Sequence, residues 1–439
     1  MEPKNNAGKL HRAWSMYDWA NSAYNLVITS TIFPAYYDAI TTTKDVSGNI
    51  IGNNVMFFGY KIDSAALYTY AIAFAYLVIA IASPILSSIA DYKGNKKSFM
   101  KFFCYIGSLA CCALYFFTKD TLSLGIICCV IAAIGYCGSL VFYNAYLPEI
   151  AVESEQDKVS AQGFAYGYFG SVILQVICFV FVLVKPFEMD AGFASRLSFL
   201  LVGLWWMGFA QIPFAVLPKN KTLHAKNNVN ILSNGFLELK KVWKQVRQMP
   251  VLRNYLGAFF FYSMGVQTVM LAATLFGSQV LHLAAEKLII CILLIQIVAI
   301  AGSYLMAKLS AILGNIKVLM ITVTVWILIC IIAYFIMTDI GFYIVAILVG
   351  FVMGGIQSLS RSTYSKLMPE TNDTTSFFSF YDVTEKVAIV IGMFSFGLIE
   401  HITGNMRNSI FALTIFFAFG FLFLLFAQRK YSRSVQQQL

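Results

Sequence analysis

Charged residues are scarce in this chain. Only 12% of its 439 residues are Asp, Glu, Lys or Arg, whereas 59% are hydrophobic, and the mean hydropathy is +0.73. A water-soluble chain of this length carries far more charge on its surface. The composition therefore excludes a soluble globular protein and predicts an integral membrane protein.

Nucleotide-binding and catalytic motifs are also missing. The sequence contains no Gly-Lys-Ser or Gly-Lys-Thr phosphate-binding loop, so ATP is not the expected energy source. The 4 histidines and 9 cysteines show no ligand-like spacing, and the cysteines fall within hydrophobic runs. We therefore expect no disulfide, no metal site, no cofactor and no enzyme activity.

Long hydrophobic runs are what the sequence does contain. A helix needs about 20 apolar residues to cross a bilayer, and about twelve such runs occur without the alternation typical of barrel strands. We therefore predict an all-α membrane protein. The predicted spans are 17–37, 64–89, 99–118, 122–147, 163–184, 197–217, 252–276, 287–308, 317–338, 342–366, 377–400 and 408–427.

Basic residues are distributed unevenly between the predicted loops. When the loops are assigned alternately to the two sides of the membrane, most of the 31 Lys and Arg fall on the side that holds both termini. Because short loops rich in Lys and Arg stay in the cytoplasm, we expect both termini to be cytoplasmic. Short tails without sorting segments favour a bacterial cytoplasmic membrane. Topology and attraction to anionic lipids explain the net charge of +10 without a nucleic-acid partner.

A polar segment, 218–251, divides the predicted spans into two equal sets. Its second half has hydrophobic residues at helical spacing among Lys and Arg, which predicts a basic amphipathic helix at the membrane surface. A linker helix is favoured over a partner-binding or regulatory element. The expected domains are an N-terminal six-helix bundle (1–217), this cytoplasmic linker and a C-terminal six-helix bundle (252–439).

The two halves contain two pairs of similar stretches. Residues 83–97 (SPILSSIADYKGNKK) align without gaps with 303–317 (SYLMAKLSAILGNIK), and 142–149 (FYNAYLPE) align with 363–370 (TYSKLMPE) at nearly the same offset. This indicates a duplicated six-helix unit. Two such pseudo-symmetric bundles typically rock about a site that lies between them.

The first span opens with a polar block, YDWANSAYNLVITSTIFPAYY. On a helix, Asp18, Asn21 and Asn25 fall on one narrow face. An ionised acid facing lipid costs several kcal/mol, so this face must meet protein or water. A water-filled cavity is favoured, and hydrogen bonds between helices are the alternative.

Span 11 holds the densest charge within the membrane. Asp382 and Lys386 lie four residues apart and can pair on one helix, which leaves Glu385 with no partner of its own. An unpaired acid beside a cation suits proton coupling or the binding of a zwitterion. The alternative is an ion-pair latch of Arg361 in span 10 with Asp382 and Lys386, which would stabilise one conformation.

Other polar residues within the spans are candidates for lining a cavity. These are Tyr143 in span 4, Gln267 in span 7 and Gln357 in span 10. Aromatic residues at helical spacing more often serve packing, so Tyr143 also has a purely structural interpretation.

The loop after the second span, SSIADYKGNKK, resembles the signature of the major facilitator superfamily. That signature has a Gly, where Ser87 stands here, and then an Asp, a Gly and basic residues, matched by Asp91, Gly94 and Lys96. The resemblance implies that Asp91 contacts the N-terminus of span 11 and acts as a latch that helps to close the cytoplasmic side. Ala311 occupies the matching position in the second half, so the latch is expected on one half only. A simple turn is the alternative.

The polar block of the first span, "PE" after span 4 and "YDVTEK" in span 11 resemble one subgroup of that superfamily, the unknown major facilitator family. Its eukaryotic relatives include the fungal vacuolar effluxer of autophagy, which exports amino acids. The resemblance implies a monomeric transporter of a small polar solute, such as an amino acid or related zwitterion, that works by rocker-switch alternating access. The coupling ion, a proton or none, stays open.

Two other functions compete with this one. A lipid or lysolipid flippase on the same scaffold would have a mostly apolar cavity, whereas the charges in spans 1, 10 and 11 favour a hydrophilic solute. A membrane receptor without transport would need sizeable soluble portions, and only 218–251 and the loop at 38–63 are available.

Overall fold

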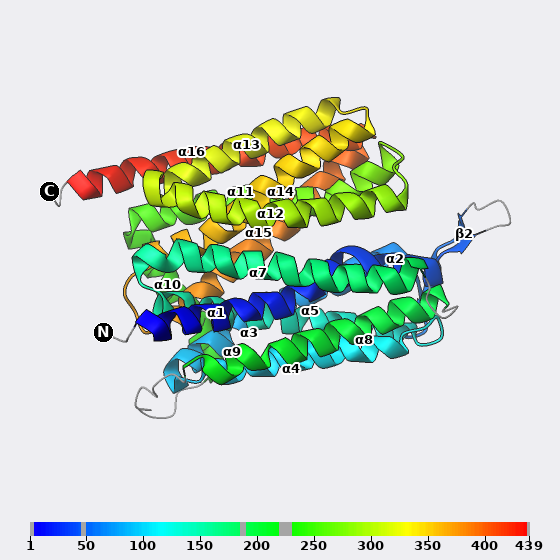
Figure 1. Ribbon diagram of the computed structural model, residues 1–439, viewed down its shortest axis with the longest axis horizontal. Helices are drawn as coiled ribbons and strands as arrows, with labels where there is room; N and C mark the ends of the chain where they lie inside the picture. Colours follow the sequence, from blue (N-terminus) through cyan, green and yellow to red (C-terminus); the bar gives the residue numbers. More distant parts are fainter. Residues whose placement is uncertain (1–3, 45–49, 185–189, 219–230, 437–439) are drawn as a thin grey trace.

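The computed structural model describes residues 4–44, 50–184, 190–218 and 231–436. Long helices lie side by side along the molecule, and both chain ends lie at the same end of it (Figure 1). We call this end the termini face. The opposite end carries a pair of short β-hairpins, and we call it the hairpin face.

In the described residues of the first half, helices and short connections make up everything except these hairpins. Strands β1 (Thr43–Lys44) and β2 (Ile50–Gly52) pair antiparallel, as do β3 (Asn54–Phe57) and β4 (Tyr60–Asp63). The helices are α1 (Lys4–Ala23), the π-helix η1 (Tyr24–Thr31), α2 (Ile32–Thr41), α3 (Ser64–Lys93), α4 (Lys96–Ala113), the 3-10 helix η2 (Leu114–Phe116), α5 (Leu122–Asn144), α6 (Leu147–Ile150), α7 (Glu153–Phe179), the π-helix η3 (Val180–Val184), α8 (Ala191–Phe209) and α9 (Gln211–Val216).

The described residues of the second half form helices joined by short connections. The helices are α10 (Ile231–Gln248), α11 (Pro250–Gln279), α12 (Ala285–Leu313), α13 (Asn315–Phe335), α14 (Asp339–Leu367), α15 (Thr374–Thr403) and α16 (Met406–Gln436). Of the predicted linker, 219–230 lie outside the described residues.

Eleven helices within the described ranges are long and apolar enough to cross a membrane. The predicted span at 17–37 is not among them, because this polar segment is divided into α1, η1 and α2. These three elements nevertheless follow one another without a break over 4–41. Several helices extend beyond the predicted apolar run: α7 begins at Glu153, ten residues before the predicted start at 163. A count of apolar residues does not detect polar turns of this kind.

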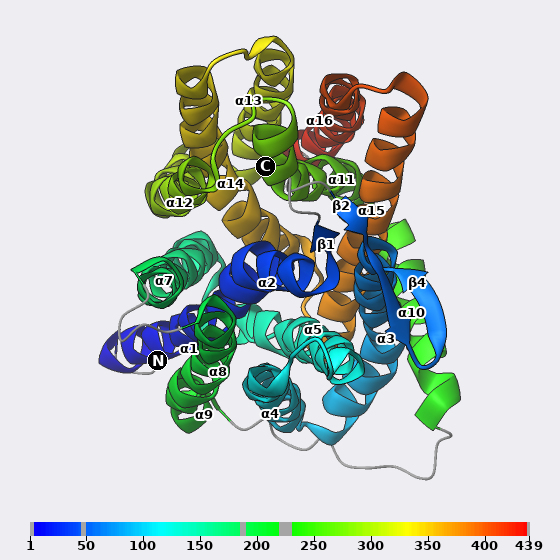
Figure 2. The same ribbon diagram turned by 90° about the vertical axis from the view of Figure 1, so that its right-hand side faces the viewer.

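The helices of the two halves form two groups, seen nearly end-on in Figure 2. One cluster of buried hydrophobic residues comes entirely from the first half. The other comes from the second half, with Ala145 and Tyr168 added from the first. Contacts between the halves join α7 to α12 and α14, and α15 to α3 and α5. That each half moves as a rigid bundle stays a prediction.

The repeated sequences occupy matching turns of the two halves. In the first half, α3 ends and α4 begins around Gly94, whose φ is +60°; in the second half, α12 ends and α13 begins around Gly314, whose φ is +86°. Glycine suits both turns because a positive φ strains residues that carry a Cβ. This agreement supports the interpretation of the repeat as a duplication.

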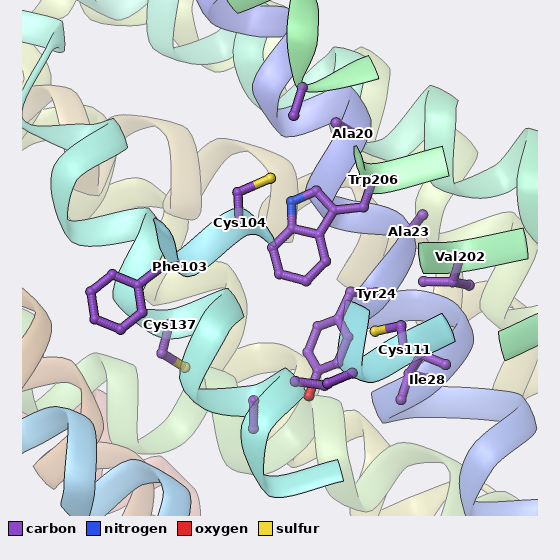
Figure 3. Packing of buried hydrophobic residues seen from close by; sticks show 14 of the residues in the cluster. Ala20, Ala23, Tyr24, Ile28, Phe103, Cys104, Cys111, Cys137, Val202 and Trp206 are labelled. Atoms are coloured by element: carbon purple, nitrogen blue, oxygen red, sulfur yellow. The ribbon is translucent and has the colours of Figure 1, made fainter. Parts of the chain in front are cut away.

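The core of the first half is packed around aromatic rings and free thiols (Figure 3). Trp206 of α8 lies 5.9 Å from Tyr24 of η1 between ring centres. Next to this cluster the backbones of α4 and α5 touch, since a Cβ on Gly135 would lie 2.5 Å from the Cα of Gly107. No group of metal-ligating side chains occurs in the described part of the chain.

Gly135→Ala is expected to lower the thermal unfolding midpoint of the purified protein, because the added methyl group has no room between α4 and α5. Overpacking of this kind costs about 1–3 kcal/mol. Gly208→Ala on α8 is the matched control, since a Cβ there meets nothing within 4 Å. Equal midpoints for the two variants would contradict the close approach of the helices.

Candidate functional site

An ion pair between the two halves lies at the centre of the candidate site. Nη1 of Arg361, on α14, lies 3.1 Å from Oδ2 of Asp18, on α1. Both residues are almost fully buried, with 3% and 5% of their surface exposed. The hydroxyl of Tyr143, on α5, donates to the same carboxylate oxygen at 2.8 Å. Burial in a low-dielectric setting makes such a pair costly to separate.

Other donors of Arg361 are also engaged. Nε donates to Oγ of Ser160 at 3.0 Å, Nη2 to the carbonyl oxygen of Ser160 at 2.9 Å, and Nη1 to Oδ1 of Asn144 at 3.2 Å. The guanidinium carbon lies 4.6 Å from the ring centre of Trp14 and 4.3 Å from that of Phe164. Every guanidinium nitrogen has a protein partner, and four of the five N–H groups of Arg361 are engaged in this conformation.

A glycine makes room for this ion pair. A Cβ on Gly163, in α7, would lie 2.6 Å from Oδ2 of Asp18 and 2.8 Å from Nη2 of Arg361. In the sequence, Gly163 is visible only as a glycine at the start of the fifth predicted span (163–184). By itself such a glycine indicates only close helix packing.

The polar face of the first span is divided between two environments. Asp18 and Asn21 are buried, whereas Asn25 on the π-helix η1 is exposed. In this conformation Asp18 therefore makes contacts between helices. This is the alternative interpretation of the polar face, whereas the sequence favours the water-filled cavity. A carboxylate within reach of a guanidinium is more stable paired than hydrated in a narrow space. The exposed Asn25 keeps its prediction as a solute contact.

A second polar cluster lies on α15. Nζ of Lys386 lies 3.2 Å from Oδ1 of Asp382, and both side chains are buried, as the spacing predicts. The prediction that Glu385 has no partner is wrong: Nε2 of Gln267, on α11, donates to it at 3.2 Å. Sequence spacing cannot show that α11 and α15 are neighbours. Glu385 keeps 25% of its side-chain surface exposed, unlike the neighbouring ion pair.

The two clusters are separate. The alternative interpretation, an ion-pair latch of Arg361 with Asp382 and Lys386, is not formed, because Arg361 pairs with Asp18 instead. Across the described ranges no hydrogen bond or ion pair connects the two clusters. Between the halves, Gln357 of α14 accepts a hydrogen bond from the hydroxyl of Tyr168 at 2.6 Å.

The contact that the resemblance implies for Asp91 is present. Its carboxylate accepts from the backbone N–H groups of Thr375 and Ser376 at 3.1 and 2.8 Å, at the start of α15. The positive end of the α15 dipole stabilises this carboxylate. Lys96, also predicted for the latch, is fully buried and forms an ion pair with Glu149.

A different polar contact joins the halves beside the matching turn of the second half, where Ala311 stands in place of an acid. Asp157, near the start of α7, lies 2.6 Å from Nζ of Lys366 and accepts hydrogen bonds from Ser310 at 2.8 Å and Asn315 at 2.7 Å. Ala311 does lack a carboxylate. The acid is instead supplied by the helix on the opposite side of the boundary, which the alignment of the repeats does not reveal.

These contacts close the molecule at the termini face. All hydrogen bonds and ion pairs between the halves in the described ranges lie near the middle of the helices or towards that face (Figure 1). In three of these contacts the acid belongs to the first half and its partner across the boundary belongs to the second. These acids are Asp18, Asp91 and Asp157.

Two pseudo-symmetric groups of spans with buried charges at their boundary define a membrane transporter of the major facilitator class, which is not an enzyme class. The chain belongs to the family described as vacuole effluxer Atg22 like, whose profile matches residues 7–437.

Relatives and solved structures agree with this assignment. The chain is 33% identical to the uncharacterized MFS-type transporter YxiO of Bacillus subtilis over 98% of this chain and 97% of that one. It is 25% identical to autophagy-related protein 22 of Yarrowia lipolytica over 82% and 75%. Among solved structures, the transporter FucP in its outward conformation aligns with a TM-score of 0.68 at 15% identity, over 96% and 98% of the two chains. The human organic anion transporter MFSD10 aligns at 0.70 and 11%, over 97% and 100%. At these identities the two structures show the fold alone.

Asp18→Asn is expected to destabilise the protein by about 3–5 kcal/mol, because it leaves the Arg361 guanidinium buried without its counter-charge. The double variant Asp18→Asn/Arg361→Gln should recover part of this loss. Thermal unfolding midpoints of the two single variants and the double variant measure the coupling. Additive losses would contradict the direct interaction.

Asp91→Ala and Asp157→Ala should each favour opening at the termini face. A cysteine placed at Ser379, which is buried at this boundary, then reacts faster with a water-soluble maleimide. About a tenfold increase is expected, since each hydrogen bond to a charged group is worth roughly 1.5–3 kcal/mol. Asp120→Ala, at an exposed acid outside the boundary, is the control. An unchanged rate in both variants would remove the latch role.

Proposed function

We propose that the chain is a secondary carrier that moves a small zwitterion, an amino acid or close relative, by alternating access between its two halves. The observation that carries the proposal is Glu385, a partly exposed carboxylate in the middle of a span beside a buried ion pair. A carboxylate in this position is costly unless it serves binding or coupling. The family resemblance supports the amino-acid class.

The polar groups around Glu385 suit a zwitterion. The Glu385 carboxylate can accept from the ammonium group of a solute, while the amide of Gln267, which contacts Glu385, can donate to the carboxylate of the solute. The buried pair of Asp382 and Lys386 keeps the charge of this region close to neutral when a zwitterion enters. Glu385 is also the candidate group for carrying a proton, because it is an acid within a span and keeps a quarter of its side-chain surface exposed.

The other cluster serves as the gate in this proposal. Opening at the termini face requires Arg361 to leave Asp18, Asp91 to leave α15, and Asp157 to leave Lys366. A solute can drive this change only by binding the open and closed states with different affinities. We propose that both termini lie on the cytoplasmic side of a bacterial membrane. The described conformation is then closed towards the cytoplasm.

Glu385→Gln is expected to reduce transport at least about tenfold, because the neutral amide no longer balances an ammonium group or carries a proton. The test measures uptake of radiolabelled amino acids into proteoliposomes, with and without a pH gradient. Glu400→Gln, near the far end of α15, is the matched control and should keep full transport. The thermal unfolding midpoint of each variant shows whether it folds.

The same vesicles separate the competing functions. If the parent protein moves no amino acid but exchanges a fluorescent lysolipid between leaflets, the flippase is correct and the proposal fails. If it moves neither amino acids nor lysolipid although its cooperative unfolding shows that it is folded, the carrier proposal fails and the receptor interpretation is favoured. Stimulation by the pH gradient that survives in Glu385→Gln would remove Glu385 from proton coupling.

A further inference from the structure

Helix α10 lies on the outside of the molecule, beside α3 and α15 (Figure 2). These two helices belong to opposite halves, and their contact is the one that Asp91 closes. Val242 and Val246 of α10 are buried, with 1% and 0% of their surface exposed. The helix therefore spans the boundary between the halves with an apolar stripe against it.

Specific contacts fix α10 to the start of α15. The Trp243 ring stacks on Phe380 with 5.9 Å between ring centres. Nζ of Lys241 lies 2.9 Å from Oδ2 of Asp373, two residues before Thr375, whose N–H binds Asp91. A force that holds α10 in place therefore acts directly beside this latch.

The opposite face of α10 is basic and exposed. Lys240, Lys244 and Arg247 are exposed there, and the acid of the helix, Glu238, is engaged with Lys241. Trp243 keeps 44% of its surface exposed, next to Arg247. Cations next to an exposed tryptophan on an amphipathic helix are typical of contact with lipid headgroups at a membrane surface.

We propose that Lys240, Lys244 and Arg247, which we call the basic strap, bind the headgroups of anionic phospholipids and thereby stabilise the conformation closed at the termini face. The occupant is the bilayer surface, because α10 packs against membrane-spanning helices and its cations are held near that surface. Each cation near an anionic leaflet contributes to the attraction.

Lipid binding is coupled to the conformation of the protein because α10 packs on both halves. Its apolar stripe needs α3 and α15 side by side, and this is the arrangement of the closed termini face. When the halves separate there, α10 loses part of its packing surface on α3 and α15. Its cations are then no longer held beside the lipid headgroups. Anionic lipid therefore binds the closed state better than the open state, which shifts the population towards the closed state.

The experiment compares nanodiscs of phosphatidylcholine alone with nanodiscs of phosphatidylcholine mixed with phosphatidylglycerol. The protein carries Ser379→Cys, and its maleimide labelling rate reports opening at the termini face. We expect labelling at least about threefold slower with phosphatidylglycerol. In Lys240→Gln/Lys244→Gln/Arg247→Gln, the rates in the two lipids should be equal.

The matched control removes the same charge from the same face of the membrane. Arg429→Gln/Lys430→Gln/Arg433→Gln alters exposed cations at the end of α16 and should keep the full lipid dependence. Equal rates in the two lipids for the parent, or loss of the dependence in the control as well, would overturn the proposal. So would soluble glycerol phosphate that reproduces the effect in phosphatidylcholine, because the occupant would then be a free anion.

This test does not depend on what the protein carries. Labelling rates can respond to lipid even if no amino acid is transported, and transport can occur without any lipid dependence. A negative result for lipid binding by the basic strap can therefore be distinguished from a negative result for the proposed carrier function.

Discussion

Charges buried in a membrane protein must find partners, and here the partners lie on the other half of the molecule. Asp18 is neutralised by Arg361, and Asp157 by Lys366. Asp91 is stabilised by the start of α15. Taking such groups out of water is costly, so the two halves hold together at the termini face as long as these contacts are made. Apolar packing inside each half supplies the rest of the structure, but it does not decide which face is closed.

The separation of the two polar clusters gives each a distinct physical character. Arg361 is enclosed by aromatic rings and has all its nitrogens engaged, which suits a contact that is either fully made or fully broken. Glu385 accepts from Gln267, lies 3.5 Å from Nζ of Lys386 and keeps a quarter of its side-chain surface exposed, which suits a group that exchanges partners. In alternating access, the first property limits leakage at the closed face and the second permits binding and release.

Much of the fold could be predicted from the sequence, because lipid requires long apolar helices and hydropathy reports them directly. The Asp382 and Lys386 pair followed from spacing on one helix, and the contact of Asp91 followed from family resemblance. The pairing of Asp18 with Arg361 could not be predicted, since these residues are 343 positions apart and spacing carries no information about neighbours in space. For the same reason the contact of Gln267 with Glu385 could not be predicted. The contact of Asp157 could not be predicted either, because Asp157 lies on α7, across the boundary from the repeated turn that holds Ala311.

The unequal sharing of charge between the halves also bears on whether either half could pair with its own copy. A single six-span unit that paired with its own copy would need both an acid and its partner on the same surface, since a twofold contact is self-complementary. In this chain the acids Asp18, Asp91 and Asp157 sit on one half only, and Ala311 stands where a second Asp91 would belong. Two copies of the first half would now bring like charges together at the boundary. Because one chain carries both sides of each contact, its two halves need not present identical surfaces, and a homodimer of either half alone would be unfavourable.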